Sequence, residues 1–366
     1  MKFICTTTHL KQALGNAERF TGKNITLPIL ANVLLEVDQN TLKVTATNLE
    51  SAIQATVHGS GVKSGKVCVP VKVLSLFVQS VGDEKIQIEE RQGSLVIKTD
   101  TRDTRINGVA PDDFPLIPQI KKAHSFTIAS SLFSEGLGRV LPSVSTSEFK
   151  PELGGVFVSV SPMSVRMAAT DTFRLAEKTI SFESRKPLEP FSFILPHRIS
   201  QEVARAFNGD EEVTISIGEN QILFESDGCM VVSRLTEGNF PEYSAIIPKN
   251  FEVSCFLQKD AFMNAVRASS IFASKLQEVT TTLKSQTIEV KSLNQDVGEY
   301  KNTIACSATS PKEVTIGFNY RYLLDGLQAT NEDEIFFGVN GDQSPSLIKN
   351  KSDSSFVYVV MPIRLS

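Results

Sequence analysis

Residues 30–48 read LANVLLEVDQNTLKVTATN, and the same pattern of apolar residues returns twice along the chain. It reappears as LGGVFVSVSPMSVRMAATD at 153–171 and as LQEVTTTLKSQTIEVKSLN at 276–294, in a frame of 123 residues. In each copy the apolar residues alternate on both sides of a short polar segment, which is typical of two strands joined by a tight turn. A period this long indicates three copies of one domain and not a solenoid of short repeats.

Each copy surrounds this hairpin with the same elements. A short strand opens the copy, an amphipathic helix follows, and a second helix and two paired strands come after the hairpin. Strands outnumber helices and short turns join consecutive strands, so we expect an α+β fold with largely antiparallel sheets. The predicted helices are 8–19, 71–81, 131–140, 197–208, 259–270 and 319–330, and the predicted domains are 1–123, 124–250 and 251–366.

Charge is unevenly distributed over this pattern. The 366 residues carry a net charge of −4, which alone gives no indication of a nucleic-acid partner because such proteins usually contain a basic domain. The six predicted helices, however, hold nine basic and five acidic residues, so they total +4 and the remainder totals −8. If the fold brings the six helices to one surface, that surface is basic under an acidic exterior.

The start of the chain and its cysteines indicate a cytoplasmic protein. Residues 1–9 contain no apolar segment of a signal peptide, and no run of about 18 apolar residues occurs. The five cysteines are scattered and form no CxxC pair, so neither a disulfide framework nor a zinc site is expected. We expect them to be small buried residues, and we expect the 23 phenylalanines to pack in the core.

Catalytic motifs are not found. The stretch 60–67 resembles a phosphate-binding loop but has Ser60 and Val67 where glycine and a hydroxyl residue are needed, so a turn between strands is the better interpretation. Asp112 and Asp113 could hold a metal, but Pro111 and Pro115 flank them, which favours a solvated turn. We expect no enzyme activity, no metal and no cofactor.

Four sequence strings carry a family resemblance: Thr26–Leu30 (TLPIL), 169–175 (ATDTFRL), 238–243 (GNFPEY) and 358–365 (YVVMPIRL). Together, and in this order along the whole chain, they resemble the bacterial DNA polymerase III beta subunit family, the beta sliding clamps. The resemblance implies three DNA-clamp domains per chain and a head-to-tail homodimer. It further implies a ring with antiparallel sheets outside, while two helices from each domain line the hole around duplex DNA.

The resemblance also implies partners and contact residues. DNA polymerase III, other polymerases, the clamp loader and repair proteins would bind through short peptide motifs, whereas duplex DNA would be held without sequence preference. The candidate DNA contacts are Lys11, Arg19, Lys23, Lys72, Arg139, Lys150, Arg198, Arg205, Arg267 and Arg321. The candidate peptide cleft comprises Leu153, Thr170, Thr172, Arg174, Leu175, Pro241, Ile246, Asn319, Tyr322, Val359, Val360, Met361, Pro362 and Arg364. The candidate dimer contacts are Ile271 and Phe272, with Ile106 as their partner.

Two short stretches depart from the family pattern. Thr172 and Phe173 stand where the family often has small or histidine residues, which would alter the wall of the cleft. Asn24 and Ile25 separate Lys23 from the Thr-Leu-Pro string, which weakens its match to a basic DNA contact. Two alternatives remain open at this point. One is a monomeric peptide-binding adaptor, and the other is a metal-dependent hydrolase that uses Asp112 and Asp113 on a repeated α+β scaffold.

Overall fold

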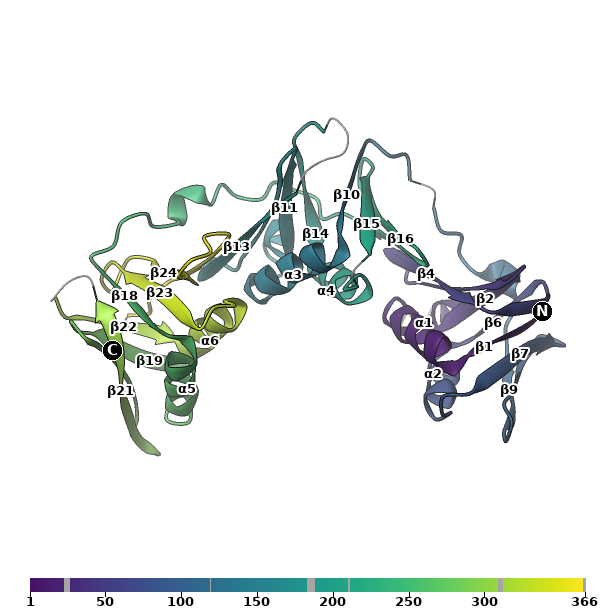
Figure 1. Ribbon diagram of the computed structural model, residues 1–366, viewed down its shortest axis with the longest axis horizontal. Helices are drawn as coiled ribbons and strands as arrows, with labels where there is room; N and C mark the ends of the chain where they lie inside the picture. Colours follow the sequence, from purple (N-terminus) through teal and green to yellow (C-terminus); the bar gives the residue numbers. More distant parts are fainter. Residues whose placement is uncertain (23–26, 119, 183–187, 210, 309–311, 365–366) are drawn as a thin grey trace. The chain divides into compact units, whose positions relative to one another are not determined.

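The structure is a computed structural model that describes residues 1–22, 27–118, 120–182, 188–209, 211–308 and 312–364. The fold is α+β with antiparallel sheets, as predicted (Figure 1). The chain forms two compact units. The first comprises Met1–Ser134 and Gln201–Leu235, and the second comprises Glu135–Ser200 and Thr236–Ser366. This division passes through the middle repeat, so the predicted domain limits stay predictions.

The first unit contains a five-stranded sheet in the order β5-β1-β7-β8-β9 and an eight-stranded sheet in the order β10-β15-β16-β17-β4-β3-β2-β6. Helices α1 (Thr7–Arg19) and α2 (Val71–Gln79) pack against each other beside them (Figure 1). The strands are β1 Lys2–Thr6, β2 Asn32–Asp38, β3 Thr41–Thr47, β4 Ser51–His58, β5 Ser60–Lys63, β6 Gly65–Pro70, β7 Lys85–Arg91, β8 Ser94–Lys98, β9 Asp103–Asn107, β10 His124–Ala129, β15 Glu212–Ile217, β16 Gln221–Ser226 and β17 Cys229–Arg234.

The second unit contains one twelve-stranded sheet in the order β14-β11-β12-β13-β25-β24-β23-β18-β21-β20-β19-β22. Helices α5 (Lys259–Ser270) and α6 (Tyr320–Ala329) pack as a pair, while α3 (Ser130–Val140) and α4 (His197–Ala206) each have residues in both units. The strands are β11 Gly155–Ser161, β12 Ser164–Thr170, β13 Arg174–Ser181, β14 Phe191–Pro196, β18 Val253–Gln258, β19 Glu278–Leu283, β20 Thr287–Asn294, β21 Gly298–Ala308, β22 Val314–Asn319, β23 Glu334–Val339, β24 Ser346–Asn350 and β25 Phe356–Val360.

The three predicted hairpins are confirmed at equivalent positions. They are β2–β3, β11–β12 and β19–β20, and the innermost apolar pairs are Val37 with Leu42, Val160 with Val165 and Leu283 with Ile288. All six side chains are buried, because alternate residues of each strand face the helices and the core. Together with two helices per copy, these pairs establish three similar α+β domains.

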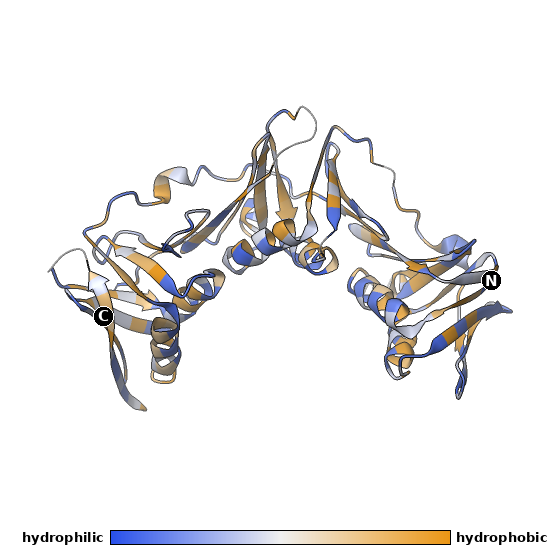
Figure 2. Cartoon of the chain, viewed as in Figure 1, coloured by the Kyte–Doolittle hydropathy of each residue, from blue (hydrophilic) through white to orange (hydrophobic). Residues whose placement is uncertain are grey.

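The helices have the predicted amphipathic character. In α5 the buried residues are Phe262, Ala265, Val266 and Ser269, a spacing that places them on one helix face. The helices accordingly show both hydrophilic and hydrophobic residues when coloured by hydropathy (Figure 2). Leu132 of α3 is an apolar exception, because it is 42% exposed.

Two local predictions also need correction. The second helices of the first two repeats end earlier than predicted, at Gln79 and Ala206. The stretch 60–67 is not only a turn, because residues 60–63 form β5, which pairs with β1 at the edge of the five-stranded sheet.

Most phenylalanine side chains lie inside the core, as expected. The fully buried ones are Phe3, Phe20, Phe133, Phe207, Phe224, Phe262, Phe318, Phe337 and Phe356. Phe149 and Phe173 are the marked exceptions, with exposed fractions of 95% and 57%. All five cysteines are free thiols, and Cys5, Cys68 and Cys255 are buried whereas Cys229 and Cys306 are half-buried.

Candidate functional site

The second and third repeats are joined by main-chain pairing inside the second unit. Strand β13 pairs with β25, so Leu175 lies opposite Val359. Beyond β25 the chain stays attached, because the Met361 amide donates to the Phe173 carbonyl at 2.8 Å and the Ile363 amide donates to the Gly317 carbonyl at 2.8 Å. The C-terminal segment therefore lies against the β12–β13 turn and the third-repeat strand β22.

Arg174 connects these parts through its side chain. Its Nε donates to Asp171 Oδ2 at 2.9 Å, and its Nη1 pairs with the carboxylate of Asp325 on α6. The guanidinium lies 4.4 Å from the centre of the Tyr322 ring, within the range of a cation–π contact. Only 12% of the Arg174 side chain is exposed, so these contacts operate with little competition from water.

The turn before Arg174 is held in one conformation by its own side chains. Thr170 Oγ1 donates to the Arg174 carbonyl at 2.6 Å and accepts from the Thr172 amide at 3.1 Å. Asp171 accepts from the amides of Phe173 and Arg174 at 2.9 and 3.0 Å. Thr172 has a φ of +78°, an uncommon conformation for a β-branched residue. The turn thereby presents Thr172 and Phe173 to solvent.

Phe173, which was predicted to alter the wall of the cleft although it was not among the candidate contacts, lies on this surface. Its ring stacks on Tyr322, with ring centres 6.5 Å apart and planes 25° apart. Burial, with the neighbouring Asp171 carboxylate adding to it, raises the pKa of Tyr322 above its ordinary value, so its hydroxyl stays protonated at neutral pH. The sequence signal for Phe173 was its place directly before Arg174 in a family motif.

The segment that connects the second and third repeats covers the adjoining sheet face with aromatic residues. Phe240 stacks on Phe157 at 5.0 Å, and Tyr243 contacts both rings edge-on. Tyr243 also belongs to a buried cluster with Leu175 and Val359. Pro241 and Ile246 remain exposed on the same segment. The GNFPEY string is therefore used for packing the connector onto the sheet.

The predicted cleft residues differ in exposure. Leu153, Leu175, Val359 and Val360 are buried. Asn319 is half-buried and caps α6 by accepting from the Arg321 amide at 2.9 Å. The residues with side-chain surface available to a partner are Thr170, Thr172, Arg174, Pro241, Ile246, Tyr322, Met361, Pro362 and Arg364.

Several of the predicted DNA contacts are engaged within the protein. Lys11 Nζ donates to the Val81 carbonyl at 2.7 Å, just beyond the end of α2. Arg19 and Arg205 share one carboxylate: Glu202 lies 3.7 Å from Arg19 Nε and 3.3 Å from Arg205 Nη1. Because the Glu202 side chain is only 10% exposed, it neutralises part of the charge of this pair.

Arg139 is a predicted DNA contact with little exposed surface. Its side chain is 14% exposed, pairs with Glu135 at 2.7 Å and donates to the carbonyl of Ala329 at the end of α6. A structural role between α3 and α6 accounts for these contacts. Four other predicted contacts are exposed, namely Lys72, Arg198, Arg267 and Arg321 on helices, as is Lys150 on a loop. Lys23 lies outside the described residues.

The predicted dimer contacts differ in exposure. Ile271, directly after α5, is 69% exposed, and the neighbouring Phe272 ring stacks on Tyr300 with centres 6.1 Å apart. Ile106 is only 6% exposed on β9, so its side chain belongs to the core of its own sheet. Strand β9 itself is the last strand of the five-stranded sheet, and its edge carries unpaired main-chain groups.

Features that would support other functions are few. Within the described ranges, no group of three or more His, Cys, Asp or Glu side chains could hold a metal ion. Asp112, one of the two acids considered for hydrolysis, pairs with Lys66 at 2.7 Å. None of the helices in the described ranges has the length and apolar character needed to span a membrane.

Comparison with known proteins gives one consistent family. Models of the N-terminal, central and C-terminal domains of the DNA polymerase III beta subunit match residues 1–118, 127–242 and 244–364. Beta sliding clamps of Synechocystis sp. and Bacillus subtilis are 29% and 24% identical, over the whole of this chain and of each relative.

Solved structures agree with this assignment. A sliding clamp from Pseudomonas aeruginosa bound to griselimycin superposes with a TM-score of 0.93 at 24% identity, and the beta subunit from Thermotoga maritima gives 0.91 at 26%. Both matches cover all of this chain and all of the other. The three consecutive domain models and the full-length relatives establish that the chain belongs to the DNA polymerase III beta subunit family, the beta sliding clamps, which are processivity factors of DNA replication and not enzymes.

Proposed function

We propose that this chain forms a homodimeric ring that encircles duplex DNA and tethers replicative and repair proteins to it. The observation that carries the proposal is the match of all three beta-subunit domains in order along one chain. A dimer of three-domain chains would bring twelve helices around the DNA. The place of action would be the bacterial cytoplasm, where the chromosome is replicated.

Weak and replaceable contacts suit such a ring. Phosphate contacts carry no sequence information, and each one is sensitive to salt. Lys72, Arg198, Arg267 and Arg321 are exposed helix residues that could make such contacts, whereas Glu202 moderates the charge of Arg19 and Arg205. Retention on DNA would then come from topology, while the modest charge would allow the clamp to slide.

The surface around Arg174 is the proposed docking site for partner peptides. The buried residues Leu175 and Val359 provide an apolar base, and Met361 adds an unbranched side chain that adapts to different apolar ligands. Polar groups of the β12–β13 turn would orient the peptide main chain. DNA polymerase III, other polymerases, the clamp loader and repair proteins would compete for this site.

The dimer contact is proposed to use Ile271 and Phe272 against the β9 edge that carries Ile106. The exposed Ile271 side chain and the Phe272–Tyr300 stack offer an apolar surface, and the β9 edge would offer polar main-chain groups to it. Such a combination is common in stable subunit interfaces. The monomeric adaptor is thus the alternative that a mass measurement would reveal.

Truncation after Val360 tests the docking site separately from the ring. This change removes Met361–Ser366, which follow the last strand, and leaves β25 intact. We expect the truncated chain to keep the mass of a dimer in light scattering and to lose binding to the replicative polymerase of the same bacterium in surface plasmon resonance. Retained polymerase binding would refute the docking site. Simultaneous loss of the dimer would refute the separation of the two surfaces.

A further inference from the structure

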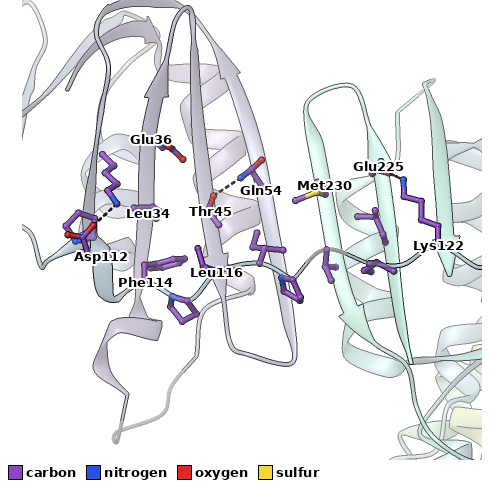
Figure 3. Close-up of a pocket in the computed structure, with 18 residues that line it drawn as sticks. Leu34, Glu36, Thr45, Gln54, Asp112, Phe114, Leu116, Lys122, Glu225 and Met230 are labelled. Atoms are coloured by element: carbon purple, nitrogen blue, oxygen red, sulfur yellow. Dashed lines mark hydrogen bonds and ion pairs between the residues drawn. The ribbon is translucent and has the colours of Figure 1, made fainter. Parts of the chain in front are cut away.

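The connector between the first and second repeats lines a half-open cavity of about 720 Å³ in the first unit (Figure 3). An exposed ion pair joins the connector to the sheet at each end: Lys66 Nζ lies 2.7 Å from Asp112 Oδ1, and Lys122 Nζ lies 2.8 Å from Glu225 Oε2. The volume is within the range of small-ligand sites, about 300–1,000 Å³.

The floor of the cavity is a row of side chains that crosses five adjacent strands. In this row Leu34 lies opposite Thr45, Thr45 opposite Gln54, Gln54 opposite Met230, and Met230 opposite Glu225. Gln54 Nε2 donates to Thr45 Oγ1 at 3.3 Å. Its carbonyl oxygen offers an acceptor in the middle of a floor that is apolar at Leu34 and Met230 and polar at Thr45 and Glu225.

The second connector covers the corresponding sheet face with aromatic side chains. There Phe240 stacks on Phe157 at 5.0 Å, and Tyr243 is only 4% exposed. The Tyr243 hydroxyl donates to Glu177 Oε2 at 2.6 Å. Burial, and to a smaller extent this hydrogen bond, raises the pKa of the Tyr243 hydroxyl, so the hydroxyl stays protonated and remains a hydrogen-bond donor. The protein thus already contains a phenol bound to this kind of surface.

The repeat relates the two surfaces residue by residue. The 123-residue frame places Leu34 at the position of Phe157 and Gln54 at that of Glu177. Strand pairing agrees, since Ala52 lies opposite Val232 as Leu175 lies opposite Val359. Both connectors begin with Phe-Pro, at Phe114 and Phe240, and counting from that pair places Ile117 at the position of Tyr243.

Smaller side chains therefore leave space where the second connector has a phenol. On the floor, Leu34 stands at the position of Phe157. On the connector, Ile117 stands at the position of Tyr243, and beside them Ala52 stands at the position of Leu175. The hydrogen-bond acceptor is nevertheless retained, because Gln54 replaces Glu177. Three carboxylates (Glu36, Asp112 and Glu225) and two amines (Lys66 and Lys122) line the cavity, a net charge of −1 that disfavours acidic ligands.

We propose that this cavity binds the tyrosine side chain of a linear peptide that carries no acidic residues. The phenol ring packs on Leu34 beside Phe114, and its hydroxyl donates to the Gln54 carbonyl, as Tyr243 donates to Glu177 in the second connector. The site is separate from the proposed docking surface around Arg174, so it offers the protein a second point of attachment for a partner.

The probe is taken from the protein's own sequence. It is a blocked peptide with the sequence of residues 239–244 and glutamine in place of Glu242, so that it is neutral. A twin peptide has phenylalanine in place of its tyrosine. Isothermal titration of the full chain is expected to show binding of the tyrosine peptide and about three- to ten-fold weaker binding of its twin, the effect of one neutral hydrogen bond.

Variants locate the binding. Leu34→Phe and Ile117→Tyr each fill the cavity from within the chain, so both are expected to abolish peptide binding, and Ile117→Tyr is expected to do so without loss of thermal stability. Met163→Phe adds a ring at an exposed turn of the other unit and is the matched control that leaves binding unchanged. The chain ending at Val360 is expected to bind the peptide as the full chain does.

Several results would overturn the proposal. These are absence of binding, equal affinity of the two peptides, and undiminished binding by Ile117→Tyr. Loss of binding on truncation after Val360 would place the peptide in the docking surface around Arg174 instead. Binding of free p-cresol without binding of the tyrosine peptide would assign the cavity to a small phenol. This result would also overturn the proposal of a peptide ligand.

Discussion

Arg174→Ala is the substitution whose effect on the second unit can be worked out most fully. It removes the Asp171 and Asp325 ion pairs and the contact with the Tyr322 ring. Breaking a buried ion pair costs about 3–5 kcal/mol, and an exposed cation–π contact contributes about 0.5–1 kcal/mol. Because Asp325 is 33% exposed and can be hydrated, the lower end applies, and we expect a loss of about 3 kcal/mol.

Differential scanning calorimetry and urea unfolding measure this loss. For a domain of this size about 1 kcal/mol corresponds to about 2–4 °C, so the melting temperature of the second unit should fall by roughly 6–12 °C. Arg166→Ala is the matched control, because Arg166 is 51% exposed and pairs with Glu177 at 3.9 Å. A surface pair of this kind is worth about 0–1 kcal/mol, so the control should change little.

The difference in stability between Arg174→Ala and Arg166→Ala tests the structural role of Arg174. Arg174→Lys should recover only part of the loss, because an ammonium cannot engage two carboxylates with the planar geometry of a guanidinium. Polymerase binding should weaken with Arg174→Ala and persist with Arg166→Ala. Equal effects of the two arginine-to-alanine changes on stability would refute the view that Arg174 holds the β12–β13 turn against α6.

Other consequences can be tested directly. Gly326→Ala should destabilise the second unit by about 1–3 kcal/mol in urea unfolding, because the added Cβ would lie 2.5 Å from the Tyr358 ring; an unchanged midpoint would contradict this packing. Ile271→Asp combined with Phe272→Asp should halve the mass measured by light scattering, and a surviving dimer would show that the interface lies elsewhere. Burial raises the pKa of the Cys5 thiol to about 12, so it should not react with Ellman's reagent at pH 8 until the chain unfolds; rapid labelling of the folded protein would disagree.

The repeat made the fold predictable from sequence to a considerable depth. Three hairpins in one 123-residue frame gave the strand pairs from Val37–Leu42 to Leu283–Ile288, because period-two alternation reports which face is buried. Helix ends were less predictable: α2 ends at Gln79, whereas the predicted helix extends to residue 81. Propensity locates an element, whereas its last turn depends on tertiary contacts.

The site was predicted in part, and what was missed depends on contacts between distant residues. Family strings marked Arg174 as a candidate peptide contact, but its partner Asp325 is 151 residues away and carries no sequence signal. Arg139 was grouped with the DNA contacts because a basic residue on a predicted amphipathic helix is usually exposed to solvent. Only the structure shows that it is engaged by Glu135 and by the end of α6.

The central claim is that the protein is held on DNA by topology. The measurement is to load the labelled dimer onto nicked circular DNA with the clamp loader of the same bacterium, wash it in high salt, and then linearise the DNA. The account predicts that the clamp survives the wash on circles, leaves once free ends are created, and stays when the ends are blocked. Release from intact circles by salt, or retention on linear DNA with free ends, would contradict it.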